Sequence, residues 1–347
     1  MDTLTHGLSG ALLASAAGRG ITLTQRERGV AGFLAAAFPD IDYVVHWADP
    51  LVYLNLHQGW THSLVLMPLW AALLAWPSAR VTRSERSWRE FYPVCLLGIG
   101  IHIGGDLITA YGTQVLAPIA MQRYAWPVTF VIDPYFTAII VLGLGLSVRW
   151  RSRKAALAAL AMLLGYVCTQ GLLRAQALAI AEGYARHAGL RDAEVMALPQ
   201  PFSPFNWKLI LAQGNVYHET HLALFRPAPA WSPGGWWFPT TRAAYRSAGA
   251  LSWRIIHRYG QDAETARLAR SVWSQPGFAG FRAFAVLPAL YRVDRGKRRT
   301  CVWFSDLRFD LPAMLPAFRY GMCKAQDDAP WRLYRLRLFT ENHRQRL

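Results

Sequence analysis

The sequence predicts an α-helical membrane bundle of about six helices, followed by an α+β domain with an antiparallel sheet. Hydrophobic residues make up 53% of the 347-residue chain and the mean hydropathy is +0.14, which is high for a soluble protein. Apolar runs of helical length dominate residues 1–182, whereas residues 183–347 show the apolar and polar alternation of strands. The net charge of +16 is uneven, because Lys and Arg outnumber Asp and Glu by 13 to 10 in the first part and by 24 to 11 in the second. We therefore expect two domains with these bounds.

Six apolar runs are expected to form the helices of the bundle. They cover residues 7–17, 29–38, 64–76, 91–105, 135–148 and 155–173. Only the last approaches the roughly 20 residues that cross a bilayer unaided, so the others need their flanks, a tilt or burial in the bundle. Thr3 and Thr5 are suitable caps for the first helix, and Thr61 is expected to open the third. Without a basic stretch and a cleavage site, the N-terminus is expected to remain as structure.

Alternating patterns and turn residues predict the second domain. The strand candidates are residues 207–212 with 216–225, 281–293 with 300–309, 318–324 and 331–339. The first two pairs flank the turns at residues 213–215 and 295–297, as the strands of hairpins do. Residues 241–273 read as one or two amphipathic helices, and Pro288 indicates an edge strand or a bulge. The expected result is a sheet of about five or six strands.

Ionisable residues stand inside the apolar first domain. His102 and Asp106 lie four residues apart in the segment GIGIHIGGDLITAYG, which places both side chains on one face of a helix. Imidazole and carboxylate groups are ordinary ligands for divalent metals, and such a pair is costly in an apolar helix without partners. The full candidate set is His6, Asp40, Asp42, His57, His62, His102, Asp106 and Asp133.

Each of these residues alone is best explained as a hydrogen-bonded core residue, but the set is better explained as a shared metal site. Eight ligands exceed one tetrahedral zinc and suit two divalent ions bridged by a carboxylate. The share of imidazole favours zinc or manganese over magnesium. The preferred metal ligands are His6, Asp40, Asp42, His62, His102 and Asp106. His57 or Asp133 is assigned as the catalytic base or as a partner that orients a ligand, and Asp2, His46 and Asp49 are weaker candidates.

Five motifs carry a family resemblance. In order, they are MDTLTHG, FPDID, HQGWTHS, HIGGDLITAYG and VIDP. This series resembles the YdjM-type inner-membrane metal-dependent hydrolases over roughly residues 1–135, with a looser likeness of WFSDLRF in the second domain. Gln58 stands where the family commonly has Arg, which puts a contact with an anionic substrate in question. The resemblance implies a hydrolase whose substrate is poorly assigned. A more distant likeness to the His-x-x-x-Asp helices of zinc-dependent phospholipase C and single-strand nucleases favours phosphoester chemistry by analogy.

The preferred function is metal-dependent hydrolysis of a phosphoester, or a related bond, in a lipid-linked or headgroup-bearing substrate. The rival is a divalent metal transporter or metal-gated membrane protein, which would spread the same ligands through the membrane depth. A nucleic-acid binder would rest on the basic second half alone, and no binding motif supports it. Contact with anionic lipid headgroups explains that charge more simply. Membrane lipid is therefore the expected partner, and the oligomeric state is left open.

Charge also predicts the orientation in a bacterial inner membrane. Three loops, at residues 19–28, 80–89 and 149–154, hold 11 of the 13 basic residues of the first domain. Placing these loops in the cytoplasm puts the His/Asp motifs and the second domain on the extracytoplasmic side. Cys301 and Cys323 could then pair, since pairing needs an oxidising compartment, whereas Cys95 and Cys168 suit apolar packing. The segment WSPGGWWF at residues 231–238 suits either an interfacial anchor or the core of the second domain.

Overall fold

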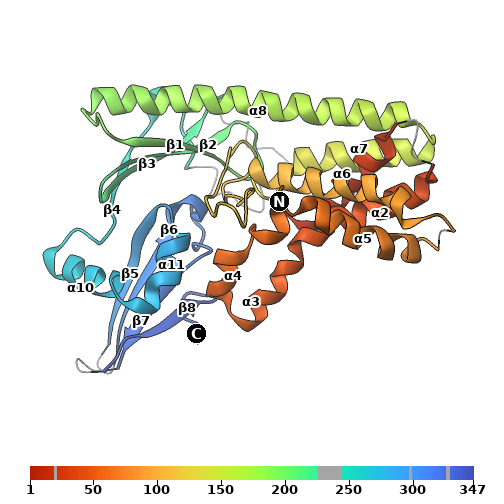
Figure 1. Cartoon of the computed structure of the whole chain (residues 1–347). Coiled ribbons are helices and arrows are strands. Elements are labelled where there is room, and N and C mark those ends of the chain that lie inside the picture. The colour runs from red at the N-terminus through yellow and green to blue at the C-terminus, as the bar shows by residue number, and fades with distance from the viewer. Residues whose placement is uncertain (19–21, 84, 226–243, 297–298, 326–328) are drawn as a thin grey trace. The chain divides into compact units, whose positions relative to one another are not determined.

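The computed structural model describes residues 1–18, 22–83, 85–225, 244–296, 299–325 and 329–347. The chain forms two compact units, unit 1 (Met1–Leu172) and unit 2 (Leu173–Leu347), and each is described by itself. The helix α8 (Arg153–His187) contributes to both units, so the domain boundary expected after residue 182 falls inside this helix (Figure 1). The Trp-rich segment 231–238 lies outside the described residues.

Unit 1 is helical, and each of the six predicted runs overlaps one helix. These helices are α1 (Thr3–Ala16), α2 (Gln25–Ala37), α5 (Met67–Val81), α6 (Trp88–Leu107), α7 (Pro134–Arg149) and α8. Two expected details were wrong. Asp2 caps α1, accepting from the Thr5 backbone N–H at 3.0 Å. The third helix begins at Met67 and not at Thr61, because the chain first makes a separate 3₁₀ turn, η2 (Trp60–His62).

The stretch between α2 and η2 lies between two of the predicted apolar runs, and it folds into short helices. They are η1 (Phe38–Tyr43), α3 (Val44–Ala48) and α4 (Pro50–Leu56). Asp49 caps α4 by accepting from the backbone N–H groups of Leu51 and Val52, with Pro50 at the first helical position. This Asp-Pro start is a strong local helix signal that the sequence reading missed.

Small residues bring the helices of unit 1 into backbone contact. A Cβ atom added at Gly10 of α1 would lie 2.2 Å from the carbonyl oxygen of Gly32 in α2. A Cβ at Gly98 of α6 would lie 2.8 Å from the Cβ of Ala35. Such close approach is typical of helix packing inside membranes. There, no hydrophobic driving force acts between helices, and small residues let the backbones come into van der Waals contact. The contacts fix the start of α1, the end of α2 and the end of α6 beside one another.

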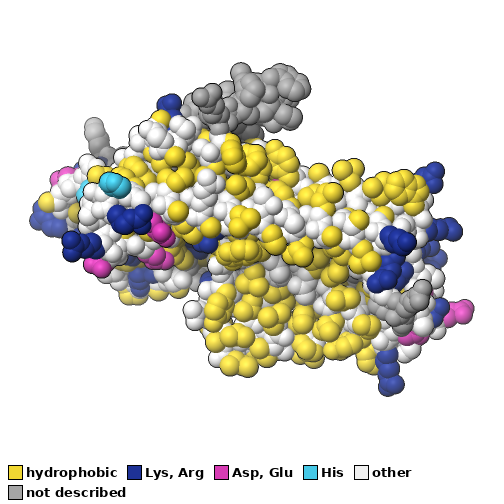
Figure 2. All heavy atoms as spheres, turned by 90° about the horizontal axis from the view of Figure 1, so that it is seen from above, with side chains coloured by type: hydrophobic (Ala, Val, Ile, Leu, Met, Phe, Trp, Pro, Cys, Tyr) yellow, Lys and Arg dark blue, Asp and Glu magenta, His cyan; other side chains and the backbone are white. Residues whose placement is uncertain are grey.

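Only α8, among the described residues, is a single helix long and apolar enough to span a bilayer. A second span results if Pro50–His62 and Met67–Val81, which meet at 81°, are counted as one broken span. The six crossings expected from the apolar runs are therefore not established. The helix α6 has 20 residues, but it carries Arg89, Glu90 and Asp106. Apolar side chains nevertheless cover much of the surface drawn in Figure 2. The exposed apolar residues of α8 include Met162, Leu164 and Leu172.

The described residues of unit 2 form two antiparallel sheets, not the single sheet that was expected. The first has the order β1 (Glu194–Pro199), β2 (Asn206–Gln213), β3 (Val216–Ala223), β4 (Arg254–His257). The second has the order β5 (Pro288–Gly296), β6 (Arg299–Asp306), β7 (Tyr320–Lys324), β8 (Arg332–Leu336), β9 (Arg344–Arg346). The last turns of α8 pack on the first sheet, where Leu173, Ala177 and Ala181 share a core with Trp207 and Leu209.

Several strand predictions are confirmed and others are corrected. The hairpin of β2 and β3 has the predicted turn, with Gln213 paired to Val216. Pro288 begins the edge strand β5, which has a bulge between Leu290 and Arg292. The expected strand 281–293 starts only there, because its first part belongs to the helix α11 (Ala279–Phe284). Within 241–273, helix forms at the 3₁₀ turn η3 (Ala248–Ala250) and at α10 (Ala263–Trp273), and the middle is the strand β4.

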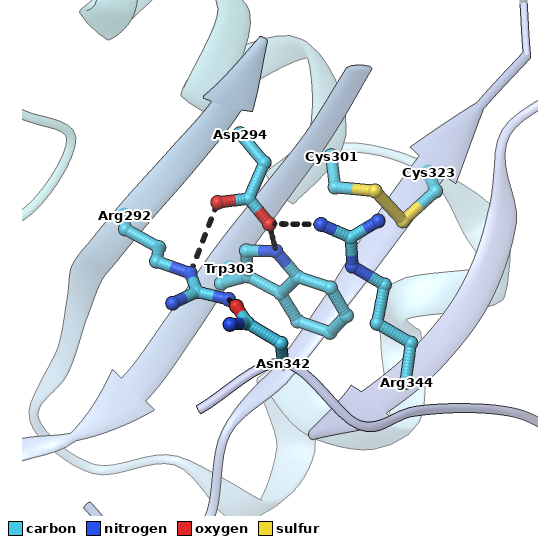
Figure 3. The surroundings of a disulfide bond; sticks show 7 residues. All are labelled: Arg292, Asp294, Cys301, Trp303, Cys323, Asn342 and Arg344. Carbon is cyan, nitrogen blue, oxygen red and sulfur yellow. Dashed lines mark hydrogen bonds and ion pairs between the residues drawn. A yellow bond between two sulfur atoms is a disulfide. The ribbon is translucent and has the colours of Figure 1, made fainter. Parts of the chain in front are cut away.

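Cys301 and Cys323 form a disulfide in the second sheet of unit 2. They are directly paired positions of β6 and β7, and both are buried against Trp303 and Leu336. Beside them, Asp294 accepts hydrogen bonds from Trp303 Nε1 and from Arg344, both at 2.8 Å (Figure 3). The pairing that the sequence left open is therefore made. The other cysteines are free, Cys95 buried and Cys168 exposed.

Candidate metal centre

Three elements of unit 1, α6, η1 and η2, bring four of the candidate ligands together. His102 and Asp106 lie in the last two turns of α6, as their spacing predicts. Asp40 follows α2 in η1, and His62 ends η2 just before α5. One nitrogen or oxygen from each of these four residues lies within 4.8 Å of those of the other three, so together they could hold a metal ion. We call this set the metal group.

Distances within the metal group are those of ligand atoms that share one metal ion. Nε2 of His62 lies 3.0 Å from Nε2 of His102, and Oδ2 of Asp106 is 3.2 and 3.3 Å from these two nitrogens. Oδ1 of Asp40 is 3.7 Å from both. Ligands placed tetrahedrally at about 2.1 Å from zinc are about 3.4 Å apart. The four atoms therefore have the spacing of a first coordination shell.

Hydrogen bonds to the Nδ1 atoms of His62 and His102 orient the Nε2 lone pairs toward the centre of the metal group. Nδ1 of His102 lies 2.5 Å from the carbonyl oxygen of Ala36, which can only accept, so Nδ1 carries the proton. The Thr61 hydroxyl donates to Asp42 at 3.2 Å, so its oxygen accepts from Nδ1 of His62 at 2.9 Å. Both neutral rings then present an unprotonated Nε2. Metal-binding histidines are usually held in this way, by a carbonyl or hydroxyl behind the ring.

The metal group fits a divalent ion by a second criterion. His62 and His102 are fully buried, and Asp106 is 1% exposed. Oδ2 of Asp106 is buried without a hydrogen-bond donor among the described residues. A buried carboxylate oxygen that faces two lone pairs is costly unless a cation lies between them. Two imidazoles and two carboxylates form a donor set that suits zinc or manganese.

His6 contacts the metal group from α1 but lies outside it. Its Nε2 is 3.0 Å from Oδ1 of Asp106, and its ring stacks on that of His102 with centroids 3.7 Å apart. Oδ1 of Asp106 also accepts from the Met1 amino group at 2.7 Å. His6 was assigned as a ligand from the sequence. Here its Nε2 contacts the Asp106 carboxylate, and its assignment as a ligand stays a prediction.

Asp42, His57 and His62 form a second set that could hold an ion. Nδ1 of His57 lies 2.9 Å from Oδ1 of Asp42, and Nδ1 of His62 is 3.7 Å from Oδ2. The two sets share the ring of His62, whereas the sequence reading expected two ions to share a carboxylate. Because Nδ1 of His62 keeps its proton for Thr61, the second set is the weaker one.

The remaining candidates have structural roles in the described residues. Asp133 caps α7 by accepting from the backbone N–H groups of Tyr135 and Phe136, and its other oxygen accepts from the Tyr166 hydroxyl at 2.7 Å. Asp2 and Asp49 likewise cap helices. His46 stacks on Tyr43 with ring centroids 5.0 Å apart.

Two residues near His57 were missed or left unexplained by the sequence reading. Arg123 donates to the carbonyl oxygens of His57 and Gly112, at 3.1 and 2.7 Å, and so fixes the loop behind His57. The sequence does single out Arg123, since it is one of only two basic residues in 1–182 outside the three basic loops. The side chain of Gln58 is buried and accepts from the Thr113 hydroxyl at 3.0 Å. Gln58 therefore supports the loop here.

Comparisons with known proteins place the chain in a family. The model of a family described as "YdjM inner membrane protein" matches residues 1–177, which is half of the chain and includes both sets of ligands. A curated relative, the "Uncharacterized protein YfhP" of Bacillus subtilis (strain 168), is 26% identical over 106 residues. That match covers 30% of this chain and 32% of the relative, so it spans about a third of each. No solved structure matches. From its first half, which carries the metal group, this chain belongs to the YdjM inner membrane protein family.

Proposed function

We propose that the protein is a membrane-embedded metal-dependent hydrolase that cleaves a phosphoester, or a related bond, of a lipid-linked or headgroup-bearing substrate. The observation that carries the proposal is the convergence of two imidazole nitrogens and two carboxylate oxygens in the metal group. Asp40, His62, His102 and Asp106 would hold the first ion, preferably zinc or manganese. Asp42 and His57 would hold or assist a second.

A divalent ion in the metal group would supply a Lewis acid that lowers the pKa of water and stabilises charge on the ester oxygens. The surrounding residues prepare the site for it. The Ala36 carbonyl and Thr61 hydroxyl hold the two imidazoles in one tautomer. His6 holds Asp106 so that Oδ2 faces both rings. Fixed ligands of this kind need no reorganisation during the reaction.

His57 is the best placed general base. Because the Asp42 carboxylate accepts from its Nδ1 at 2.9 Å, the neutral ring keeps a lone pair on Nε2 and can take a proton from water there. The ring lies edge-on to His62 with centroids 5.5 Å apart, so it is close to the metal group without belonging to it. Asp133, the other candidate base, is engaged as the cap of α7.

The positions of the ligands favour hydrolysis over metal transport. His6 lies near the start of α1, Asp40 follows the end of α2, and His102 is near the end of α6. The basic loops 19–28 and 80–89 join the opposite ends of these same helices. The ligands therefore gather at one end of unit 1. A permeation path would need further ligands along the helices, whereas the two sets found among the described residues share His62 and so lie together.

We further propose that unit 2 lies on the extracytoplasmic side of the inner membrane. Two independent observations support this side. The spanning helix α8 is preceded or begun by four basic residues, Arg149, Arg151, Arg153 and Lys154. Such a cluster is typical of the cytoplasmic end of a membrane span. The Cys301–Cys323 disulfide belongs to unit 2, and disulfides persist in oxidising compartments.

The test is turnover by the purified full-length chain in liposomes. Phosphatidic acid, phosphatidylglycerol and a polyprenyl diphosphate are offered with zinc or manganese, and released headgroup or phosphate is measured. We expect cleavage of at least one lipid, and at least a hundredfold loss in His102→Ala. The same liposomes, loaded with a zinc-sensitive dye, test the rival. Metal flux without cleavage of any lipid would replace the hydrolase by a transporter.

A further inference from the structure

A groove of about 530 Å³ lies on unit 1 beside the metal group. Its walls come from α2, η1 and α5, and include Leu34, Phe38, Leu74 and Val81. Ser78 also lines it, but its hydroxyl donates back to the Leu74 carbonyl at 2.8 Å. The walls are thus almost entirely apolar, and the other polar residues that line the groove are Asp40 and Thr3.

Asp40 and Thr3 lie side by side in the lining of the groove. Oδ2 of Asp40 accepts from the Thr3 hydroxyl at 2.6 Å, whereas Oδ1 faces the Nε2 atoms of His62 and His102 at 3.7 Å. One carboxylate therefore lines the groove and also belongs to the metal group. A molecule in the groove would have its nearer end beside the candidate metal.

Resting on the proposed function, we propose that this groove holds one hydrocarbon chain of the lipid whose headgroup is cleaved at the metal group. The apolar walls exclude a sugar or peptide, which would need hydrogen-bond partners along its length. A hydrocarbon chain has no such need, and an inner membrane protein meets one everywhere on its apolar surface. The lipid's first polar group would then lie at Asp40.

The groove would position the substrate more than it would strengthen substrate binding. Lipid tails are as apolar as leucine side chains, so a chain gains little by leaving the bilayer for the groove. Its effect is to hold the scissile bond in line with the metal group, and orientation of this kind contributes strongly to rate. The groove therefore selects substrates by the hydrocarbon that adjoins the headgroup.

The alternative is that lipid covers this face loosely, as it covers the rest of the membrane surface. The helix α5 offers a matched comparison. Leu74 lines the groove and is half-buried, whereas the adjacent Leu73 is 58% exposed and lies outside it. Loose coverage would contact Leu73 at least as much as Leu74. A hydrocarbon chain bound in the groove would contact Leu74 but not Leu73.

Photolabelling of the full-length chain in liposomes tests the proposal. The probe is phosphatidylglycerol with a diazirine close to the carboxyl end of one acyl chain, and labelled peptides are mapped by mass spectrometry. Label is expected on residues 34–41 and 74–81. It should fall at least tenfold in Leu74→Trp, which fills the groove, and stay within twofold of wild type in Leu73→Trp. Equal labelling in the two variants, or label spread evenly over α7 and α8, would overturn the proposal.

Two further measurements keep the outcomes distinct. If Leu74→Trp fails to fold, judged by its melting temperature, Leu34→Trp fills the groove from α2 and decides in its place. Labelling needs no turnover, so it is repeated with Asp106→Asn, where the groove label should persist. Labelling of the groove without lipid cleavage by the wild type would contradict the proposed reaction but support the bound hydrocarbon chain. Cleavage without groove label would remove the bound chain and keep the reaction.

Discussion

The Nε2 atoms of His62 and His102 lie 3.0 Å apart, although the partners behind each ring leave both nitrogens unprotonated in the neutral state. Both rings are fully buried, and Oδ2 of Asp106 faces them without a hydrogen-bond donor among the described residues. Three converging electron pairs repel one another unless a cation joins them. The arrangement is therefore built for a bound cation, and a divalent metal satisfies all of its atoms at once.

The first prediction concerns metal content. The purified chain should carry at least one divalent ion, zinc or manganese, because the metal group supplies four ligand atoms. His102→Ala should lower the bound metal at least tenfold, since it removes one of two imidazoles from the shell. Elemental analysis after desalting measures both. The matched control is His343→Ala, an exposed histidine of unit 2, which should keep the metal. Absence of stoichiometric metal, with an unchanged melting temperature after chelation, would contradict the prediction.

The second prediction separates metal ligands from the general base. Asp106→Asn should abolish lipid cleavage and lower bound metal, because the amide replaces a charged ligand. His57→Ala should lower the rate about 10²- to 10⁴-fold, the usual contribution of a general base, while the first ion remains bound. Turnover is measured beside metal content for each variant. Equal metal loss in both would place His57 in the metal shell, and normal turnover in Asp106→Asn would move the site elsewhere.

The sequence predicted those parts of the site that depend on spacing within one element. His102 and Asp106 share a helix face because four residues make about one turn, and this held. Apolar runs likewise located all six long helices of unit 1. Which of the candidates belong to the metal group depends on contacts between residues that are far apart in the chain. Only the structure shows that Ala36, from the end of α2, accepts from His102.

The errors in unit 2 have a similar cause. A pattern of alternation identifies a strand but does not say which sheet it joins, and here the strands divide between two. The strand β1 ends in a proline and β9 has three residues, so neither produced a readable pattern. The helix α11 was read as the start of β5, because phenylalanines at 281 and 284 suit either structure. Tertiary packing decides such segments.

The third prediction concerns the disulfide of unit 2. Replacing Cys301 and Cys323 by serine should lower the free energy of unfolding of unit 2 by about 3 kcal/mol, the value expected for a closed loop of this length. Melting is followed with and without reductant, and reductant should affect the wild type alone. Cys168→Ser, which changes an exposed free cysteine, is the control. If reductant lowered the melting temperature of the double variant as much as that of the wild type, the effect would not come from the Cys301–Cys323 bond.

The fourth prediction is a pH dependence in unit 2. Burial raises the pKa of the Asp310 carboxyl from 3.8 to about 6. A carboxyl with a raised pKa in the folded state favours folding below pH 4, and this contribution is lost as the pH rises through 6. Asp310→Asn should therefore stabilise the fold by up to about 3 kcal/mol above pH 7 and have little effect near pH 4.

The substitution suits the surroundings of Asp310. Its carbonyl oxygen, which accepts from Lys208 at 2.8 Å, is unchanged, and the asparagine oxygen can still accept from the Ser305 hydroxyl. Chemical denaturation from pH 4 to 8 measures the difference between variant and wild type. Burial lowers the pKa of the nearby His221 to about 4, so acidification destabilises both proteins through this group. Only in the wild type does protonation of Asp310 offset this loss, so the variant should be destabilised more steeply. A stability difference that does not change with pH would contradict the assigned shift.

The last prediction is the orientation of α8. Four basic residues just before or at its start, Arg149, Arg151, Arg153 and Lys154, should hold that end in the cytoplasm, so unit 2 follows on the extracytoplasmic side. The excess charge of unit 2 does not oppose this, because large domains cross largely regardless of charge. Alkaline phosphatase fused after Leu347 should be active, and green fluorescent protein at the same point should be dark. Replacing the four basic residues by glutamine should weaken the preference, whereas removing the basic residues of β9 should not. Fluorescence without phosphatase activity in the wild type would put unit 2 in the cytoplasm, where the Cys301–Cys323 disulfide would be reduced.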